Sequence, residues 1–546
     1  MTRQQFPPSV VDHSDTADSD TAHSDTVHSD TAECFDVAIV GFGPTGATLA
    51  SLLAQRGCRV VVVETSPLLN PDPRASFFDG DSLRVWQQLG IGDEIAGVSI
   101  PLPGLHFRNA DGDLILDWPM PSTAGTSSWP ASNLLHQPVM EAILRRRAEE
   151  LGAIVRLGEH VLAISQTDEY ATLLSKTTTG VSSIRARFVV GCDGGSSTVR
   201  SVLGFAWDDF DCTLHWRLAD VEITGPSELL DVTTAVMDPA GPRMVGHLAH
   251  NRYRWLWLQP GGNSGPWPEP ADVLTSLSHG VGPHNALLTR QASYVAHARV
   301  SQRWSAGRVF VAGDAAHQLP PLLGQGIGAG VRDVANLAWK LAHVLAGQLP
   351  FEVLDSYECE RKFHAAAVVK LSAAISSYVF TWDPALAAER DARLAVGDIP
   401  LDLIPMPVSL GASPLHAASI TAGSEFPQWM LDDGVRTDDL LGDAFALVVL
   451  PRLSAHADRF QAQLFSALGV DLTAWQTNVA RNERLDQIAE PWLTTNQLAA
   501  VLIRPDRMVA CCVGLASALS AALPAHVGDA FKEHAVSAAL SSAGPS

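Results

Sequence analysis

The sequence has no long apolar runs. No stretch of its 546 residues approaches the ~18 consecutive apolar residues that a membrane span requires, so no such span is expected. Hydrophobic residues nevertheless make up 46% of the chain, which is enough for a substantial core and excludes global disorder. On the usual prior of about 150 residues per domain, the length predicts three or four domain-sized units.

Cysteine is scarce and scattered. The seven cysteines are odd in number and include no CxxC pair. A disulfide framework or a zinc site is therefore not expected, and the predicted location is the reducing cytoplasm.

Positive charge is also scarce, with 37 Lys and Arg against 59 Asp and Glu and a formal net charge of −22. Nucleic acids and anionic membranes bind basic surfaces, so neither is an expected partner. Part of the acidity lies at the N-terminus, where residues 13–32 form a degenerate five-residue repeat, HSDTA-DSDTA-HSDTV-HSDTA. The repeat is too polar to become ordered by burial, so residues 1–34 are predicted to be a disordered tail.

A phosphate-binding turn follows the tail. Residues 36–40 are a short apolar run typical of a buried strand, residues 47–56 have helical character, and residues 59–63 predict a second strand ending at Glu64. The turn before the helix reads GFGPTG and supplies five candidate cofactor-binding residues: Gly41, Gly43, Pro44, Thr45 and Gly46. Its glycines permit the tight bend, the backbone approach to a pyrophosphate and close helix packing. Glu64 is placed for a ribose hydroxyl and would repel a 2′-phosphate, so the turn predicts FAD or NAD rather than NADP.

Two later strands each end in an Asp beside Gly. Residues 187–191 lead to Asp193, and residues 308–312 lead to Gly313 and Asp314. Ligands bind at this edge of a doubly wound sheet, so Asp314 is a candidate for the ribityl hydroxyls of a flavin. The next loop precedes a helix whose N–H donors would face the flavin pyrimidine. That loop supplies three more candidates: Pro321, Gly324 and Gly326.

Together these motifs resemble those of single-component FAD-dependent aromatic hydroxylases, which are flavoprotein monooxygenases. The subgroup that the chain resembles most is the 3-(3-hydroxyphenyl)propionate hydroxylase and phenol hydroxylase-like one. The matching segments are GFGPTG (41–46), DPRA (72–75), DGDSLRVWQQLG (79–90), HQPVMEAIL (136–144), CDGGSSTVR (192–200), GRVFVAGDAAHQLPPLLGQGIGAGVRDVANLAWKL (307–341) and YECER (357–361). The resemblance covers residues 35–375, and the segment 307–341 is its most specific part.

The resemblance implies an α/β fold. Its parts are a Rossmann-like FAD domain of discontinuous segments, an inserted β-sheet substrate domain and a C-terminal thioredoxin-like domain. The corresponding boundaries are 1–34 (tail), 35–205 and 301–395 (FAD domain), 206–300 (substrate-binding sheet) and 396–546 (linker and C-terminal domain). The C-terminal region has no CxxC, and its adjacent Cys511 and Cys512 do not form that redox pair. We hypothesise a structural or homodimer-supporting role for it.

The resemblance also implies individual roles. The glycine turn and Glu64 would bind the ADP half of FAD. Arg74 and Gln137 would contact the pyrophosphate or ribityl side, and Asp314 the ribityl chain. Without that context, Arg74 would suit a surface salt bridge and Gln137 a helix cap. The loop 321–326 would border the isoalloxazine ring.

The implied reaction is hydroxylation of a phenolic or polycyclic aromatic substrate. NADH or NADPH would reduce the flavin, and O₂ would then form a flavin C4a-hydroperoxide that attacks the ring. Asp193 is associated in this family with both FAD and the nicotinamide. The protein must exclude water and hold the ring close to the peroxide. The catalytic residues are unknown, because no sequence feature identifies a base for the phenol.

One strand of the inserted region has an aromatic face. Within residues 251–258, strand alternation places Tyr253, Trp255 and Trp257 on one side. They would line a pocket for a flat substrate or, equally well, form a packed sheet face. Further candidates for the pocket are His215, Trp216, Arg217 and His247.

Three other functions fit parts of the sequence. Residues 255–260 are similar to the tryptophan signature of flavin-dependent halogenases, but those enzymes need a lysine well before Lys176, the first lysine here. A same-fold FAD reductase or dehydrogenase would not insert oxygen. A flavin-binding chaperone-like protein would not oxidise NAD(P)H. We predict the monooxygenase, with a small aromatic compound and O₂ as its substrates.

Overall fold

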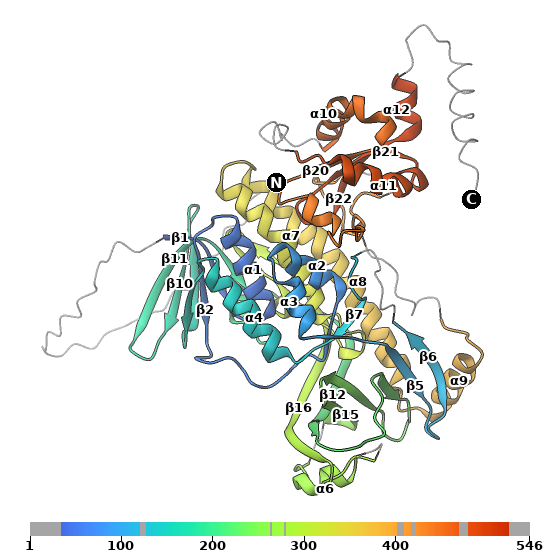
Figure 1. Ribbon diagram of the computed structural model, residues 1–546. Helices are drawn as coiled ribbons and strands as arrows, with labels where there is room; N and C mark the ends of the chain where they lie inside the picture. Colours follow the sequence, from blue (N-terminus) through green and yellow to red (C-terminus); the bar gives the residue numbers. More distant parts are fainter. Residues whose placement is uncertain are drawn as a thin grey trace, which may run out of the picture.

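The structure is a computed structural model that describes residues 34–120, 127–262, 265–277, 280–400, 409–416, 421–468 and 479–522 (Figure 1). The predicted disordered tail, apart from Cys34, lies outside the described residues. The described residues form two eight-stranded sheets and two three-stranded sheets.

The first eight-stranded sheet has the order β17-β18-β11-β1-β2-β8, with β10 and β9 continuing from β11. Its strands are β1 (Cys34–Val40), β2 (Val60–Glu64), β8 (Ile154–Leu157), β9 (His160–Gln166), β10 (Ala171–Lys176), β11 (Val181–Gly191), β17 (Ser305–Ala306) and β18 (Val309–Val311). The strands from β18 to β8 are parallel. In β2, all four valines are buried, as expected for a parallel strand covered on both faces. This parallel core agrees with the predicted α/β class. We call the unit around it the FAD domain, after the cofactor that the resemblance leads us to expect there.

Helices cover this sheet and lead to the other units. They are α1 (Pro44–Gln55), α2 (Gly80–Gln88), α3 (Gly92–Gly97), α4 (Gln137–Glu150), α5 (Thr198–Val202), α7 (Gly326–Leu345), α8 (Asp355–Val379) and α9 (Pro384–Ala395). Short 3₁₀ turns are η2 (Gly313–Ala315), η3 (Pro321–Leu323) and η4 (Phe351–Leu354), and a small sheet joins β3 (Phe77–Asp79), β7 (Ser132–Leu134) and β4 (Ile100–Pro101). Helix α1 packs against α4 and α7. The turns that follow β1, β11 and β18 each carry glycine, and they lie at the same end of the parallel strands.

The second eight-stranded sheet, here called the roof sheet, has the order β19-β16-β12-β15-β14-β13-β5-β6. Its elements are β5 (Gly104–Arg108), β6 (Leu114–Pro119), β12 (Trp207–Ile223), β13 (Thr233–Val236), β14 (Arg243–Ala249), β15 (Arg252–Gln259), η1 (Pro260–Gly262), α6 (Pro270–Thr275), β16 (Ala286–Ser301) and β19 (His317–Gln318). Strands β5, β6 and β19 of this sheet lie outside the predicted range 206–300. They join it because β13 pairs with β5 in parallel and β16 pairs with β19. Strand alternation alone does not show so distant a pairing.

The C-terminal unit contains the antiparallel sheet β20-β21-β22. Its elements are η6 (Thr437–Leu440), β20 (Ala446–Val449), η7 (Pro451–His456), α10 (Ala457–Leu468), α11 (Glu483–Thr495), β21 (Leu498–Ile503), β22 (Val509–Gly514) and α12 (Leu515–Ala522). A parallel bridge joins Ala446 to Ala480 on the other side of β20. The order of elements is therefore strand, helix, bridge, helix, two strands and helix.

A buried ion-pair cluster fixes the C-terminal unit to the FAD domain. Arg504, at the end of β21, donates hydrogen bonds to both carboxylate oxygens of Glu360 in α8 at 2.8 and 2.9 Å. Lys340 in α7 donates to the same carboxylate at 2.8 Å, and all three side chains are fully buried. Burial would raise the pKa of Glu360, but Arg504 and Lys340 outweigh it, and the pKa lies well below the usual range. We call this cluster the charged junction.

A second set of buried charges extends the charged junction to α2. Arg84 donates to both carboxylate oxygens of Asp438 at 2.7 and 2.8 Å, and Arg507 donates to one of them at 3.0 Å. Arg84 also lies 3.1 Å from Glu425. Burial, Glu425 and Asp79 raise the pKa of the nearby Asp81 to about 8.

No single helix among the described residues is long and apolar enough to cross a membrane, and the pair Phe351–Val379 and Pro384–Ala395, bent by 104°, meets that test by length and composition only. Within the same part of the chain, no group of three or more His, Cys, Asp or Glu side chains is arranged to hold a metal ion.

Candidate active site

The glycine turn between β1 and α1 is shaped by backbone crowding. Gly41 has φ +99°, and a Cβ there would overlap the carbonyl oxygen of Cys192. A Cβ on Gly46 would overlap the carbonyl oxygen of Gly41. Both positions therefore require glycine, as the motif predicted. At Gly43 the nearest atom to an added Cβ is a guanidinium nitrogen of Arg74, 4.0 Å away.

The beginning of α1 offers donors for a phosphate group. Gly43 is the N-cap residue and provides no side-chain cap, and Pro44 occupies the first turn. The exposed amides and positive dipole of a helix N-terminus attract anions. Together with the Arg74 guanidinium beside Gly43, they form a donor set that suits a pyrophosphate.

Glu64 is oriented by two main-chain amides. Its Oε2 accepts a hydrogen bond from the Phe42 N–H and its Oε1 one from the Ser66 N–H, both at 2.8 Å. These contacts hold the carboxylate at the end of β2, beside the glycine turn. A carboxylate has further lone pairs, and these suit the hydroxyls of a ribose.

Asp314 lies in the turn after β18. Gly313 has φ +61°, and a Cβ there would approach the Thr45 hydroxyl to 2.8 Å, so this turn lies against the start of α1. The Asp314 side chain is exposed to solvent, yet surrounding protein raises its pKa, against the opposing effects of His317 and Arg74. None of the described residues donates a hydrogen bond to its carboxylate. An acidic acceptor in this place suits the hydroxyls of a ribityl chain.

The Asp314 turn is supported by a triad that the sequence did not reveal. Asp333 in α7 accepts a hydrogen bond from the Gly313 N–H at 3.0 Å, lies 2.7 Å from His317 Nε2, and accepts from Arg361 Nε at 3.0 Å. All three side chains are buried. Burial would raise the pKa of Asp333, but His317 and Arg361 lower it below the usual value. The residues belong to the matching segments 307–341 and 357–361, which is the signal that could have found them.

Within the loop 321–326, the 3₁₀ turn η3 is followed by Gly324, which adopts the left-handed conformation with φ +62°. A Cβ on Gly324 would overlap the ring of Phe77, whereas nothing lies within 4 Å of one on Gly326. The side chain of the following residue, Gln325, is held by Arg332, which donates a hydrogen bond to its Oε1 at 2.7 Å. Arg332 in turn pairs with Asp79 at 2.5 Å, so the loop is tied to the start of α2.

Gln137 acts on the loop that carries Arg74. Its Oε1 accepts hydrogen bonds from the main-chain amides of Arg74 and Ala75 at 3.0 and 2.8 Å, and its Nε2 donates to Glu141 at 3.3 Å. These contacts hold Arg74 in place, and the contact of Gln137 with the cofactor stays a prediction.

Asp193 also has a structural function. Its carboxylate accepts hydrogen bonds from the Ser197 hydroxyl at 2.5 Å and the Val199 N–H at 3.0 Å, at the start of α5. Burial raises its pKa. Asp193 therefore stabilises the turn before α5, and its association with FAD and NAD(P)H stays a prediction.

The roof sheet is anchored to the Arg74 loop by Arg254. This buried side chain donates to both oxygens of Asp220 at 2.6 and 2.9 Å and to the carbonyl of Arg74 at 2.8 Å. Arg290 on β16 donates to the carbonyl of Pro73 at 2.6 Å. Arg254 and Asp220 are paired across β15 and β12, so their side of the roof sheet is the inner face, directed at the FAD domain.

An apolar cluster covers the inner face. It joins roof residues to the loop 321–326 and to the end of α8, and we call it the inner-face cluster. Its members include Phe77, Trp216, Leu218, Met244, Leu256, Leu258, Tyr294, Leu322, Leu323, Ile375, Tyr378, Val379 and Phe380. Burial raises the pKa of Tyr294, which keeps it neutral. Among the described residues, neither the Trp216 indole N–H nor the Tyr378 hydroxyl has a hydrogen-bond partner. Trp216 was among the pocket candidates of the sequence, whereas Tyr378 was missed, because nothing in the sequence shows that the end of α8 meets the inner face.

The aromatic residues predicted to line the substrate pocket lie on the other side. Tyr253, Trp255 and Trp257 share one face, as expected, but it packs against α6 and not against the FAD domain. His215 belongs to the same outer face, since it alternates with Trp216 along β12. The alternative interpretation, a packed sheet face, is the one that the structure shows for Tyr253 and Trp255.

The residues of the glycine turn, Glu64, Arg74 and Asp314 therefore meet at one edge of the parallel sheet, and their donors and acceptors fit a flavin dinucleotide. The inner-face cluster lies beyond the loop 321–326. This arrangement suits a redox reaction of an apolar compound in a water-poor environment.

Comparison with known proteins agrees with this geometry. The family described as FAD binding domain matches residues 34–372, and the family described as HcaD C-terminal domain matches residues 423–526. The chain is 31% identical over 487 residues to the probable NADH-specific resorcinol 4-hydroxylase of Rhodococcus jostii (strain RHA1), covering 87% of this chain and 91% of that protein. It is 32% identical over 526 residues to 3-(3-hydroxy-phenyl)propionate/3-hydroxycinnamic acid hydroxylase 2 of Burkholderia vietnamiensis (strain G4 / LMG 22486), covering 89% and 95%.

Solved structures share the fold. The flavin-dependent monooxygenase PieE in complex with FAD and substrate superposes with a TM-score of 0.72 at 21% identity, covering 88% of this chain and 96% of that one. The p-nitrophenol 4-monooxygenase PnpA from Pseudomonas putida DLL-E4 gives a TM-score of 0.60 at 26% identity, covering 68% and 95%. The chain therefore belongs to the FAD-dependent aromatic hydroxylases, which are flavoprotein monooxygenases.

Proposed function

We propose that this FAD-dependent hydroxylase acts on a phenol or diphenol that carries no charged group, with NADH as the reductant. The observation that carries the proposal is the inner-face cluster, which lies against the loop 321–326 and is apolar apart from neutral hydroxyl and indole groups. The substrate ring would lie between this cluster and the loop.

FAD would be held by the residues at the sheet edge. We assign the ADP half to the glycine turn and Glu64, the pyrophosphate to Arg74 and the α1 N-terminus, and the ribityl chain to Asp314. The loop 321–326, which includes Pro321, Gly324 and Gly326, would border the ring system. When bound, FAD accepts a hydride from the nicotinamide and activates O₂ for insertion into the substrate.

The side chains of the inner-face cluster would exclude water and orient the phenol. Apolar residues from the roof sheet and α8 keep solvent away from the reacting atoms. The Tyr378 hydroxyl and the Trp216 indole N–H, which lack partners among the described residues, would hydrogen-bond the phenol hydroxyl. They are candidate substrate contacts, and a base for the phenol is not assigned.

The described residues of the inner-face cluster offer no available positive charge, which supports a neutral substrate. Arg254 is committed to Asp220 and to backbone carbonyls. Arg390, which touches the end of α8, donates to the carbonyls of Val379 and Met237 at 2.8 and 2.7 Å and to Asp391. A substrate carboxylate would therefore lack a partner at the described part of the inner-face cluster, and burying it there would be costly.

The relatives support the reaction and the choice of NADH. One is named as an NADH-specific resorcinol 4-hydroxylase, and resorcinol is an uncharged diphenol. Both curated relatives named above are hydroxylases, which favours oxygen insertion over the same-fold reductase.

The test is turnover of the FAD-loaded enzyme with NADH and ¹⁸O₂ and a panel of ring compounds. We expect resorcinol or a substituted phenol to stimulate NADH oxidation and to yield a product with one ¹⁸O atom. NADPH should support slower turnover. Phenol-stimulated NADH oxidation that yields hydrogen peroxide and no labelled product would contradict hydroxylation, whereas a preference for 3-(3-hydroxyphenyl)propionate would contradict only the neutral substrate.

We further propose that the C-terminal unit is a thioredoxin-like domain with a structural role. Its order of elements and its parallel bridge followed by antiparallel strands support the first statement. The charged junction supports the second. The homodimer and the cytoplasmic location stay predictions.

A further inference from the structure

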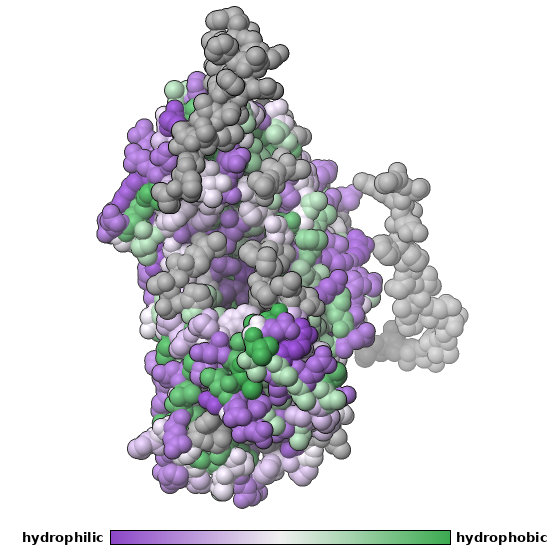
Figure 2. All heavy atoms as spheres, turned by 90° about the vertical axis from the view of Figure 1, so that its right-hand side faces the viewer, coloured by the Kyte–Doolittle hydropathy of each residue, from purple (hydrophilic) through white to green (hydrophobic). Residues whose placement is uncertain are grey.

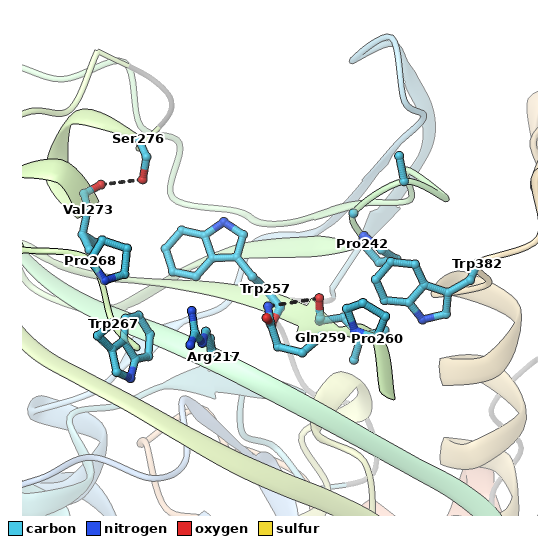
Figure 3. A pocket seen from close by; sticks show the side chains of 13 residues that line it. Arg217, Pro242, Trp257, Gln259, Pro260, Trp267, Pro268, Val273, Ser276 and Trp382 are labelled. Atoms are coloured by element: carbon cyan, nitrogen blue, oxygen red, sulfur yellow. Dashed lines mark hydrogen bonds between the residues drawn. The ribbon is translucent and has the colours of Figure 1, made fainter. Parts of the chain in front are cut away.

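The pocket of the roof sheet and the charges around α2 differ in what they connect. The pocket has a volume of about 310 Å³, and Figure 3 shows Arg217 in it beside Trp257 and Trp267. The Arg217 guanidinium stacks on Trp267 and donates to the carbonyls of Gly265 and Pro266, so it holds the wall of the pocket together. Figure 2 shows hydrophobic side chains gathered over the lower part of the molecule, where α9 and the roof sheet lie. The buried charges around α2, by contrast, connect two separate units.

Arg332, in the second turn of α7, joins the loop 321–326 to the start of α2. Its Nη2 donates to Gln325 Oε1 at 2.7 Å, and its Nη1 donates to Asp79 at 2.5 Å and to Asp81 at 3.2 Å. The Arg332 side chain is only 17% exposed. Because a guanidinium is planar, its donors hold their acceptors in fixed directions. The position of the Gln325 side chain is therefore set relative to the two carboxylates.

The Asp79 end of this link is itself fixed. Asp79 is the N-cap residue of α2, and its Oδ1 accepts hydrogen bonds from the Ser82 N–H at 3.0 Å and from the Ser82 hydroxyl at 2.7 Å. Its Oδ2 lies so close to α7 that a Cβ on Gly328 would overlap it. The ring of Phe77 fits equally closely against Gly324 in the loop. A shift of β3 and the start of α2 would therefore move the loop as well.

Arg84 connects the same helix, α2, to the C-terminal unit. It is buried, donates to both carboxylate oxygens of Asp438 at 2.7 and 2.8 Å, and lies 3.1 Å from Glu425. Burial would lower the pKa of Arg332, but the two carboxylates at the start of α2 and, after them, Glu425 raise it. The C-terminal unit therefore contacts α2 through Arg84 and also acts electrostatically on the arginine that holds the loop.

From these contacts we propose that Arg332 and Gln325 position the loop 321–326 against the ring system of FAD, and that Arg84 makes this position depend on the C-terminal unit. The proposal rests on the assignment of the loop to the ring system in the proposed function. Arg332 and Gln325 are positioning residues, since they hold the loop and do not touch the reacting atoms. A misplacement of about 1 Å at a reacting centre costs up to about a hundredfold in rate. The C-terminal unit would thus influence turnover without contributing a residue to the active site.

The first test is Gln325→Ala, which breaks the link at the loop and leaves Arg332 paired with both carboxylates. In the FAD-loaded enzyme, hydrogen exchange of the main-chain amides of residues 322–328 should become at least about tenfold faster, because a hydrogen bond to a charged group is lost. The visible absorption maximum of the bound flavin should shift, and kcat should fall at least about tenfold. Arg332→Lys, whose single ammonium does not hold the acceptors in one plane, should produce the same changes to a smaller extent.

The second test concerns the C-terminal unit. Arg84→Lys retains the charge but not the forked contacts, and it should speed the same exchange about threefold. In the Gln325→Ala background it should add nothing, because the link is already broken. Glu425→Gln, at a side chain that is 28% exposed, repeats this test with less risk to folding. The matched control is Arg436→Lys, at another arginine contact between the two units, 3.2 Å from an aspartate of α3, which should leave the loop and the flavin spectrum unchanged.

Thermal melting and the FAD content establish that each variant is folded. Unchanged exchange in Gln325→Ala would overturn the proposal, and so would faster exchange with an unchanged flavin spectrum. If Arg84→Lys and Glu425→Gln have the same effect with and without Gln325, or no larger effect than the control, the dependence on the C-terminal unit is wrong. Neither the exchange nor the spectrum depends on which phenol is hydroxylated or on ¹⁸O incorporation, so the proposal and the proposed function fail separately.

Discussion

The FAD domain meets its two neighbours through contacts that differ in how deeply their charges are buried. Toward the C-terminal unit, the charged junction pairs Arg504 and Lys340 with Glu360 in complete burial. Toward the roof sheet, the contact consists of the apolar inner-face cluster together with arginine side chains that donate to backbone carbonyls. The C-terminal boundary thus adds fully buried ion pairs to an apolar core that it shares with the FAD domain. The roof boundary combines apolar packing with arginine contacts that include the partly exposed pair of Arg290 and Asp72.

This difference teaches which boundary tolerates change. A buried charge that loses its partner costs several kcal/mol, so the charged junction permits few substitutions. Apolar side chains of similar volume replace one another at small cost, so the inner-face cluster can vary with little loss of stability. We infer that substrate preference changes most readily at the roof boundary, while the C-terminal boundary preserves the fold.

The largest expected effect comes from breaking the charged junction. Glu360→Gln would leave Lys340 buried without its carboxylate partner and Arg504 with Asp506 alone, and should lower the free energy of unfolding by about 3–5 kcal/mol. Denaturant unfolding measures it. The control is Glu94→Gln at the exposed pair with Arg146, where the loss should stay below about 1 kcal/mol. Equal losses in the two variants would remove the contrast between the boundaries.

The second largest effect is a loss of FAD affinity, at a residue that lies outside the charged junction. Asp314→Ala should raise the FAD dissociation constant about a hundredfold, because a carboxylate acceptor worth about 1.5–3 kcal/mol is lost. Titration of apoenzyme with FAD, followed by flavin fluorescence, gives the constant. Asp398→Ala, at an exposed pair with Arg393, serves as the control. Stoichiometric FAD in purified Asp314→Ala would show that the ribityl contact is assigned to the wrong residue.

A smaller effect tests the roof boundary. Tyr378→Phe should raise the KM for the phenol about tenfold with little change in the free energy of unfolding, because the hydroxyl has no partner among the described residues. Steady-state kinetics and denaturant unfolding together check this. A loss of stability with an unchanged KM would instead mean a purely structural hydroxyl.

The smallest effect concerns pH. The pKa of Asp81 is raised to about 8, so between pH 4 and pH 8 the group is protonated in the folded protein and ionised in the unfolded chain. Stability is therefore lost as the pH rises through this window. Asp81→Asn should flatten that dependence and raise the Tm at pH 7.5 by about 1–2 °C, since the side chain is 33% exposed and partly screened. An unchanged slope of Tm against pH would exclude Asp81 as its source.

Features that depend on residues close together in the chain could be predicted from the sequence. The glycine turn, Glu64 and the Asp314 turn are each specified by residues close in the chain and by the parallel strands before them. The use of FAD is confirmed by the family match, while the individual cofactor contacts remain predictions. The α/β class was implied by the family resemblance that these motifs carry.

The rest depended on pairings between distant segments. Alternation along β15 correctly placed Tyr253, Trp255 and Trp257 on one face, but which face meets the FAD domain is decided by the Arg254 contacts with the Arg74 loop. Likewise, the Asp333 triad joins α7, η2 and α8, and no periodic pattern marks such a contact. The contact of Gln137 with the Arg74 backbone spans 63 residues, so no local pattern in the sequence predicts it.

The interleaving of the two large sheets has a consequence for biosynthesis. Strand β11 needs β18, which ends at Val311, and the roof sheet gains its last strand, β19, only at Gln318. On a ribosome, both sheets therefore reach completion at almost the same point of translation, and the nascent chain carries unpaired strand edges until then. Such late, long-range pairing makes folding slow and exposes the growing chain to aggregation. We expect that truncations ending between β5 and β18 will be insoluble, and that a chaperone will bind the nascent chain over this interval.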